Sequence, residues 1–242
     1  MSTLFISDLH LSAQQPNLTR LFLYFLQHQA RHAEALYILG DLFETWIGDD
    51  NETPFNKQIA TALAELTASG VATYFMAGNR DFLMGQRFIE KTGCKLLADP
   101  KLITLYGIPT LLMHGDSLCT LDKRYVIFRR LTRTRFLQSL FLKLPLWLRQ
   151  KIACYLRGND NDHENTLSDE TKFDVVMSTL CSDLKRYPAQ LIIHGHTHKP
   201  CIQLFQVNKS LLKRIVLSDW NTKQGNVLII SPNKRCELIY FS

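Results

Sequence analysis

Apolar and polar positions along the first two-thirds of the chain, and again over residues 169–194, favour short strands separated by helices. Six apolar runs have the length of a buried strand: residues 3–7, 35–40, 71–78, 101–106, 110–114 and 189–194. Helices are predicted over residues 18–30, 54–69 and 169–186, with short helices or turns near 82–92. Strand–helix alternation of this kind predicts a mainly parallel sheet with helices on its faces.

After residue 200 the pattern changes to apolar runs that are separated only by short polar turns. These runs cover residues 200–206, 211–218, 226–231 and 235–241. Because no helical segment lies between them, they predict a meander of antiparallel strands. The chain has no internal repeat and no low-complexity segment.

Residues 122–157 interrupt the strand–helix pattern. They are rich in Leu and Phe, contain Pro145 and predict two helices. A polar tract, Gly158–Glu170, closes the segment with turn-forming and charged residues. The chain therefore predicts a single domain, residues 1–242, with a helical insertion over residues 122–165.

The net charge of +6 is distributed unevenly. Residues 123–157 contain ten Lys and Arg and no Asp or Glu, so the rest of the chain has a net charge of −4, from 18 Lys and Arg against 22 Asp and Glu. This concentration points to an anionic partner: a nucleic acid, a phosphorylated substrate or an acidic lipid surface. The alternative is a solvated helix face.

Six cysteines are scattered along the chain without a CxxC pair. Such spacing is expected for reduced thiols in a cytosolic protein and argues against a zinc ribbon or a disulfide framework. The N-terminal sequence MSTLFISDLH has no basic segment before its apolar run, so a signal peptide is not expected. No uncharged apolar run reaches the ~18–20 residues that are needed to cross a bilayer.

Five short motifs with carboxylate, imidazole or amide groups follow predicted strands. They are Asp8-Leu9-His10, Gly40-Asp41, Gly78-Asn79-Arg80-Asp81, His114-Gly115-Asp116 and Gly195-His196-Thr197-His198. The carboxyl ends of strands line the ligand crevice of open α/β sheets, so these motifs can converge there. Their donor atoms suit Mn²⁺, Fe²⁺ or Zn²⁺. A single Asp or His at a strand end is commonly structural, but the whole set predicts a metal site.

The order D-x-H, GD, GN, H and GH-x-H across residues 8–198 resembles the calcineurin-like metallophosphoesterase superfamily. The resemblance implies an α/β fold, a sandwich of two mixed β-sheets flanked by helices, with the helical insertion as a lid. It also implies two metal ions that are bridged by Asp41. One ion would be held by Asp8, His10, Asp41 and His198, and the other by Asp41, Asn79, His114 and His196.

Arg80 departs from the superfamily pattern, in which histidine usually follows the GN pair. Arginine is a poor general acid near neutral pH, but its guanidinium group binds phosphate well. A diphosphate that releases a nucleoside monophosphate expels a phosphate group, which needs less protonation than an alkoxide does. Arg80 therefore favours pyrophosphate cleavage over phosphodiester cleavage, and we expect Arg80 and Asp41 to be catalytic residues.

Four longer stretches are similar to the UDP-2,3-diacylglucosamine pyrophosphohydrolase family of the lipid A pathway: residues 35–50, 78–85, 114–122 and 191–200. This resemblance implies hydrolysis of UDP-2,3-diacylglucosamine to 2,3-diacylglucosamine 1-phosphate (lipid X) and UMP, by water attack on the α-phosphorus with two Mn²⁺ ions per chain. It implies a peripheral protein on the cytoplasmic side of the bacterial inner membrane. Neither nucleic acid nor an obligate protein partner is expected.

The Leu- and Phe-rich insertion fits such a substrate, because an enzyme that acts on a diacyl nucleotide must enclose acyl chains and reach a membrane. Phe128, Leu131, Phe136 and Leu140 form a stripe that an ordinary helix would bury in a core. Since apolar residues of the insertion cover more than one helix face, we expect part of them to line a chain-binding groove or to contact the membrane.

The same resemblance implies substrate contacts from Asn79, Arg80, Asp122 and His194, and from Asp160 and Asn165 in the loop after the insertion. Two of these residues have alternative roles. His194 could be a buried, hydrogen-bonded histidine, and Asp122 could be the N-cap of the first insertion helix. Asp81 and Asp116 are expected to orient neighbouring groups rather than to bind metal directly.

Two other functions remain open. A nuclease or cyclic-nucleotide phosphodiesterase could use the same two-metal core, with the basic insertion holding nucleic acid. The crowding of Leu and Phe opposes this, because base stacking uses scattered aromatic residues. A non-enzymatic binding scaffold is the second alternative, and it is disfavoured because every expected ligand position is filled.

Overall fold

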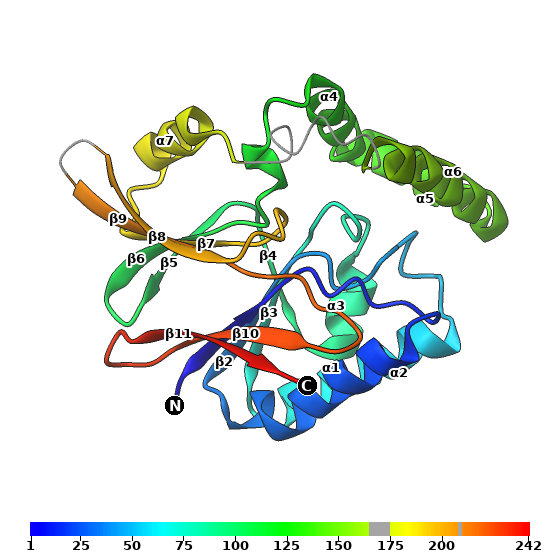
Figure 1. Ribbon diagram of the computed structural model, residues 1–242. Helices are drawn as coiled ribbons and strands as arrows, with labels where there is room; N and C mark the ends of the chain where they lie inside the picture. The colour runs from blue at the N-terminus through cyan, green and yellow to red at the C-terminus, as the bar shows by residue number, and fades with distance from the viewer. Residues whose placement is uncertain (165–174, 208–209) are drawn as a thin grey trace.

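Two β-sheets lie face to face at the centre of the molecule (Figure 1). The computed structural model describes residues 1–164, 175–207 and 210–242, with the backbone alone described for residues 157–164. Among these residues, no helix is long and apolar enough to cross a membrane.

The first sheet has six strands and is mixed. β1 to β4 are parallel to one another, whereas β10 is antiparallel to both β1 and β11. In spatial order the strands are β11 (Cys236–Phe241), β10 (Gly225–Ile230), β1 (Thr3–Ile6), β2 (Ala35–Leu39), β3 (Ala72–Met76) and β4 (Lys95–Leu97).

The second sheet has five strands and is also mixed. Its three inner strands, β6, β7 and β9, are parallel, and the edge strands β5 and β8 are antiparallel to their neighbours. In spatial order the strands are β5 (Lys101–Leu105), β6 (Ile108–Leu112), β7 (Leu191–His194), β9 (Ser210–Val216) and β8 (Cys201–Val207).

Helices cover the outer face of each sheet. On the first sheet these are α1 (Pro16–His28), α2 (Pro54–Ala68) and α3 (Gln86–Thr92), and on the second α7 (Met177–Arg186). β1 shows how a central strand serves two layers: Leu4 and Ile6 pack under the helices, whereas Phe5 packs between the sheets. The predicted sandwich of two mixed β-sheets flanked by helices is confirmed.

The predicted C-terminal meander is wrong in one respect, because its strands belong to different sheets. β8 and β9 form a hairpin in the second sheet, and β10 and β11 form a hairpin in the first. Periodicity shows that residues form strands but does not show which sheet a strand joins. The short and largely exposed β4 has no clear apolar run and was not predicted.

The insertion contains three helices rather than the two that the sequence predicts: α4 (Lys123–Thr132), α5 (Arg135–Leu142) and α6 (Leu146–Glu164). The chain leaves the helical path at Arg133 and Thr134, in addition to the expected break at Pro145. α6 continues to Glu164, so the turn-rich interpretation of residues 158–164 is wrong. The helix expected at 169–186 is present as α7 from Met177, and residues 169–174 lie outside the described residues.

Candidate metal centre

Six of the seven predicted metal ligands lie in two groups of three. Within each group the donor atoms are within 4.8 Å of one another. The groups are Asp8, His10 and His198, and Asp41, His114 and His196. The seventh residue, Asn79, is next to the second group, where its Oδ1 atom lies 2.8 Å from His114 Nε2. The structure thus brings all seven residues together.

The residues reach this site from the loops that follow five strands, β1, β2, β3, β6 and β7. Because these strands end at the same edge of the sandwich, segments far apart in the sequence become neighbours. Backbone hydrogen bonds join the first two loops: the N–H of Asp8 donates to Gly40 O at 3.1 Å, and the N–H of His10 donates to Asp41 O at 2.9 Å.

Five of the predicted ligands adopt the left-handed backbone conformation that non-glycine residues usually avoid. Their φ angles lie between 49° and 68°: Asp8, His10, Asp41, His196 and His198. Only two other non-glycine residues in the described part of the chain have positive φ. Strained backbone of this kind is found where a site requires a particular side-chain direction. The sequence alone gave no sign of it.

Two glycines allow the loops to approach closely. A Cβ atom at Gly78 would collide with the carboxylate of Asp41, and one at Gly195 would collide with the carboxylate of Asp8. Neither glycine needs a positive φ, because neither is among the residues with that conformation. The need at these positions is for space beside the two carboxylates.

The donor atoms of each group are close enough together to bind a single metal ion. Donors bound at about 2.0–2.2 Å from one ion lie no more than about 4.4 Å apart. Asp41 Oδ2 lies 4.0 Å from His10 Nε2 and 3.7 Å from His114 Nε2, so this carboxylate stands between the groups. His198 Nε2 lies 3.5 Å from Asp8 Oδ1. Imidazole and carboxylate donors suit Mn²⁺, Fe²⁺ or Zn²⁺.

Contacts with neighbouring residues hold one atom of a candidate ligand and leave its other donor atom facing the site. The Nδ1 atom of His114 is 2.9 Å from Leu39 O, which directs Nε2 toward Asp41. His10 Nδ1 lies 3.2 Å from Glu44 Oε2 in the same way. Asp8 accepts hydrogen bonds on Oδ2 from Ser7 Oγ at 2.6 Å and from the N–H of His196 at 2.9 Å, and this leaves Oδ1 toward His198.

The electrostatics of the site favour positive charge beside the carboxylates. Burial lowers the pKa of His114, but the carboxylates of Asp41, Asp116 and Asp8 outweigh it and raise the pKa to about 9. His196 differs, because burial and the nearby His114 lower its pKa to about 3. A neutral imidazole of this kind is the form that binds metal.

Comparison with known proteins identifies the family. A model of the family described as calcineurin-like phosphoesterase matches residues 1–200. A UDP-2,3-diacylglucosamine hydrolase of Coxiella burnetii is 51% identical over 239 residues, which cover 99% of this chain and 97% of the relative. Proteins of the same name are 49% identical in Aeromonas hydrophila, covering 97% of each chain, and 44% identical in Escherichia coli, covering 100% and 99%. The chain belongs to the UDP-2,3-diacylglucosamine hydrolase family.

Two buried carboxylates beside the candidate ligands hold loops of the protein in place. Asp81 accepts hydrogen bonds from the N–H groups of Gly78 and Leu42, both at 2.8 Å, and so ties the β3 loop to the β2 loop. Asp116 accepts hydrogen bonds from Tyr125 Oη and Arg129 Nε. Neither carboxylate is in a donor group, which agrees with the orienting roles expected from the sequence.

His194 is a buried, hydrogen-bonded histidine and Asp122 is a helix N-cap, as the alternative interpretations of these residues predict. His194 is fully buried; its Nδ1 lies 2.8 Å from Gly195 O, and its Nε2 accepts a hydrogen bond from Arg214 Nε at 2.9 Å. Burial and the charge of Arg214 lower the pKa of His194 to about 4. Asp122 caps α4 by accepting a hydrogen bond from the N–H of Tyr125 at 2.9 Å. Contact of either residue with substrate stays a prediction.

Arg80, Asp160 and Asn165 are the other residues that were predicted to contact the substrate. Arg80 is half-buried, and its backbone N–H donates to Asp41 Oδ1 at 2.8 Å. Asp160 lies in the part of α6 that is described by its backbone alone, and Asn165 lies outside the described residues.

At least three of the ten basic residues of the insertion pair with other groups of the protein, so the charge of the insertion is not all directed at an anionic partner. Arg129 donates a hydrogen bond to Asp116, and Arg133 donates one to Gly78 O, both in loops of the candidate metal centre. Arg149 is buried and donates hydrogen bonds to Ile47 O and to the Asp50 carboxylate. A charge count cannot show such pairing, because the partners lie far away in sequence.

Proposed function

We propose that this protein hydrolyses the pyrophosphate bond of UDP-2,3-diacylglucosamine, releasing UMP and 2,3-diacylglucosamine 1-phosphate. The observation that carries the proposal is the pair of donor groups on either side of Asp41. Relatives that bear the name UDP-2,3-diacylglucosamine hydrolase and match nearly the full chain support the choice of substrate.

Two Mn²⁺ ions are the proposed cofactors. Asp8, His10, Asp41 and His198 would hold one, and Asp41, Asn79, His114 and His196 the other. Bound at these positions, the ions supply an activated water and neutralise charge on the attacked phosphoryl oxygens. The carboxylate of Asp41, which lies within 4.0 Å of histidines from both groups, is placed to keep the two sites together.

Arg80 is the proposed phosphate-binding residue. It follows Asn79 directly, and its backbone is tied to Asp41. Its guanidinium can form two parallel hydrogen bonds with a phosphate and stays charged at any physiological pH. Because the acylated sugar 1-phosphate leaves with a phosphate oxygen when water attacks the α-phosphorus, the reaction needs charge stabilisation more than proton donation, and Arg80 supplies it.

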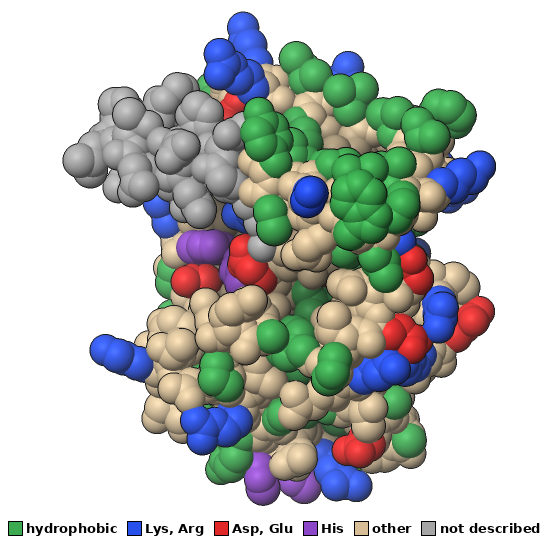
Figure 2. Space-filling model, turned by 90° about the vertical axis from the view of Figure 1, so that its right-hand side faces the viewer, with side chains coloured by type: hydrophobic (Ala, Val, Ile, Leu, Met, Phe, Trp, Pro, Cys, Tyr) green, Lys and Arg blue, Asp and Glu red, His purple; other side chains and the backbone are tan. Residues whose placement is uncertain are grey.

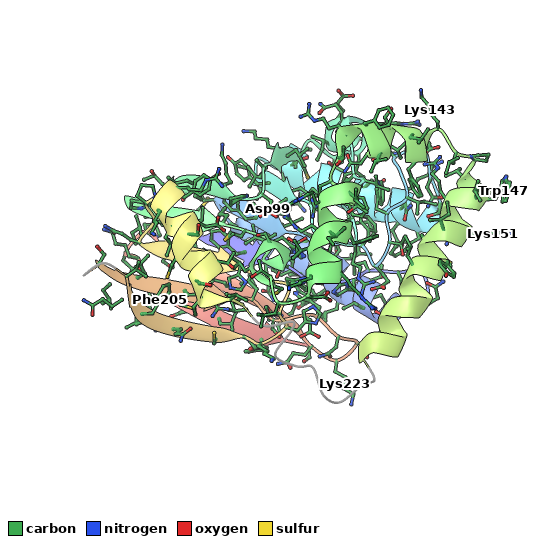
Figure 3. All side chains as sticks on the ribbon, turned by 90° about the horizontal axis from the view of Figure 1, so that it is seen from above. Asp99, Lys143, Trp147, Lys151, Phe205 and Lys223 are labelled. Atoms are coloured by element: carbon green, nitrogen blue, oxygen red, sulfur yellow. The ribbon has the colours of Figure 1, made fainter. Side chains whose placement is uncertain are left out.

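The insertion is the proposed contact with the acyl chains and with the cytoplasmic surface of the inner membrane. More than half of the large hydrophobic side chains that are exposed in the described residues lie between Leu121 and Leu156. Figure 2 shows them gathered on the upper part of one face. Trp147 and Lys151 on α6 point away from the body of the protein (Figure 3). Aromatic and basic residues together favour the interface of an anionic bilayer.

Release of UMP from detergent-dispersed UDP-2,3-diacylglucosamine with Mn²⁺ tests the proposed activity. We expect UMP and the acylated sugar phosphate in equal amounts, with no cleavage of single-stranded oligonucleotides or of bis(p-nitrophenyl) phosphate. Efficient cleavage of oligonucleotides with intact lipid substrate would instead support the nuclease alternative and contradict the proposal.

A further inference from the structure

One face of α4 points at the edge of the sandwich that carries the candidate metal centre. Tyr125, Arg129 and Arg133 follow one another at intervals of four residues, a spacing that places their side chains on the same side of a helix. Arg133 is the residue at which the helix ends. All three contact Asp116 in the loop after β6, and Tyr125 and Arg133 each reach a further loop of the metal centre. None of the three was singled out from the sequence.

Tyr125 contacts the loop after β7. Its ring stacks against the ring of His196, with the centroids 6.2 Å apart and the planes at 25°. Its hydroxyl donates a hydrogen bond to Asp116 Oδ2 at 2.9 Å. The ring therefore limits the movement of His196 while the hydroxyl is anchored to the loop that carries His114.

Arg129 holds two carboxylates near His114. Its Nε donates to Asp116 Oδ2 at 2.8 Å, and its Nη2 donates to Asp99 Oδ2 at 3.1 Å. The other oxygen of Asp99 accepts a hydrogen bond from the backbone N–H of His114 at 3.2 Å. Asp99 lies next to α4 in Figure 3. Both carboxylates are almost fully buried, so their pairing with one guanidinium offsets the cost of burying their charge.

Arg133 reaches the loop after β3. Its Nη2 donates hydrogen bonds to Gly78 O at 2.9 Å and to Ala77 O at 3.5 Å, directly before Asn79. Its guanidinium carbon also lies 5.6 Å from the centre of the Phe82 ring. The position of Asn79 thus depends on a side chain from the insertion.

Three of the loops that α4 contacts carry Asn79, His114 and His196, the residues that would hold the second ion together with Asp41. None of the contacts recorded for the side chains of Tyr125, Arg129 and Arg133 within the described residues involves Asp8, His10 or His198. We propose that this face of α4 positions the second metal site, so that binding of the second ion depends on the docked insertion whereas binding of the first does not. The inference rests on the proposed function, since it requires two ions.

Manganese binding to the full chain tests this inference without any measurement of turnover. Titration calorimetry gives the two affinities, and electron paramagnetic resonance separates a single Mn²⁺ ion from a spin-coupled pair. We expect Arg129→Ala to weaken one of the two affinities by about 10- to 100-fold, as loss of a group that orients a ligand does, and to leave the other unchanged. The spin-coupled signal would then appear only at correspondingly higher Mn²⁺.

Arg130→Ala is the matched control, because Arg130 is the next residue on α4, is exposed and carries the same charge. Its variant is expected to bind both ions as the natural protein does. Arg129→Lys keeps the charge, but a lysine can reach only one carboxylate at a time. The affinity of this variant for the second Mn²⁺ ion is therefore expected to lie between those of Arg129→Ala and the natural protein. Tyr125→Phe, which keeps the ring and removes the hydroxyl, provides a second test if Arg129→Ala does not fold.

The outcomes separate the inference from the function on which it rests. Fewer than two ions on the natural protein would contradict the proposed function. Two ions on the natural protein with both affinities unchanged in Arg129→Ala and Tyr125→Phe would overturn the positioning role alone. An equal loss at both sites would also overturn it, because a general structural role predicts that result.

Discussion

The Nε2 atoms of His10 and His198 lie 3.5 Å apart, although the two histidines are 188 positions apart in the sequence. Lone pairs of two neutral imidazoles repel each other at this distance unless a proton or a cation lies between them. Each ring also faces a carboxylate: His10 faces Asp41 and His198 faces Asp8. The arrangement is that of a binding site for a cation, and it explains why a first ion is expected there.

Replacing His10 with alanine is expected to remove this ion and to reduce turnover by several orders of magnitude, because the activated water depends on both ions. Steady-state release of UMP and metal analysis of the purified variant measure the two effects. His32→Ala is the control, since His32 is exposed in the short helix η1 (Ala30–His32). Near-normal turnover of the His10 variant would contradict the ligand assignment.

Arg80→Ala is expected to lower turnover strongly while both ions stay bound. The side chain is assigned to the phosphate rather than to a metal, so its loss removes charge stabilisation in the transition state. Turnover and metal content are measured on the same preparation, with Arg87→Ala as the control because Arg87 is an exposed arginine of α3. A parallel fall in metal content would assign Arg80 a structural role instead.

The hydrophobic surface of the insertion is expected to mediate binding to vesicles that contain anionic lipids. Trp147 and Phe136 are 61% and 74% exposed. Removing one such contact with a bilayer, by Trp147→Ser or Phe136→Ser, is expected to weaken vesicle binding by about tenfold or more. Leu204→Ser on β8 is the matched control, because Leu204 is 62% exposed but lies outside the insertion. Equal loss in all three variants, measured by cosedimentation, would argue against a specific membrane face.

Arg149 is expected to anchor the base of α6. It is only 2% exposed and donates hydrogen bonds to Leu144 O at 2.9 Å, to Ile47 O at 2.6 Å and to the carboxylate of Asp50. Arg149→Ala is expected to lower the free energy of unfolding by about 2–4 kcal/mol, because the buried Ile47 O and the half-buried Leu144 O lose their donor and Asp50 loses its partner. Urea denaturation measures this change, and Lys151→Ala, at an exposed position of the same helix, is the control.

The ion pair between Arg149 and Asp50 makes the free energy of unfolding depend on pH. Hydrogen bonding to Arg149 lowers the pKa of Asp50 below its value in the unfolded chain. The stabilisation is therefore present above the unfolded pKa of about 4 and is lost as the pH falls through the lower folded value. Asp50→Asn is expected to remove this part of the acid sensitivity. An unchanged slope of stability against pH below 4 would show that the pair contributes nothing.

The clustering of the five motifs could be predicted from the sequence because each follows a strand, and because parallel strands end at a common edge. The assignment of Asp8 and His198 to one ion came from the resemblance to the metallophosphoesterase superfamily. Their left-handed backbone could not be predicted, since it depends on loops that hold one another in place. Which sheet each C-terminal hairpin joins was likewise decided by packing between distant strands.

The basic insertion shows a different limit of sequence reasoning. Its charge and hydrophobicity were evident, but the number of its helices depended on a break at Arg133 and Thr134 that contains neither glycine nor proline. Arg129 and Arg149 could not be separated from the solvent-exposed basic residues, because their acidic partners Asp99, Asp116 and Asp50 come from the body of the domain. A repeat of four residues linking Tyr125, Arg129 and Arg133 was the one available signal.

Hydrolysis of UDP-2,3-diacylglucosamine in ¹⁸O-labelled water tests the central claim most directly, because it reports both the substrate and the phosphorus that water attacks. The account predicts that the label appears in UMP and is absent from the acylated sugar phosphate. Label in the sugar phosphate, or release of neither product with Mn²⁺ bound, would contradict it.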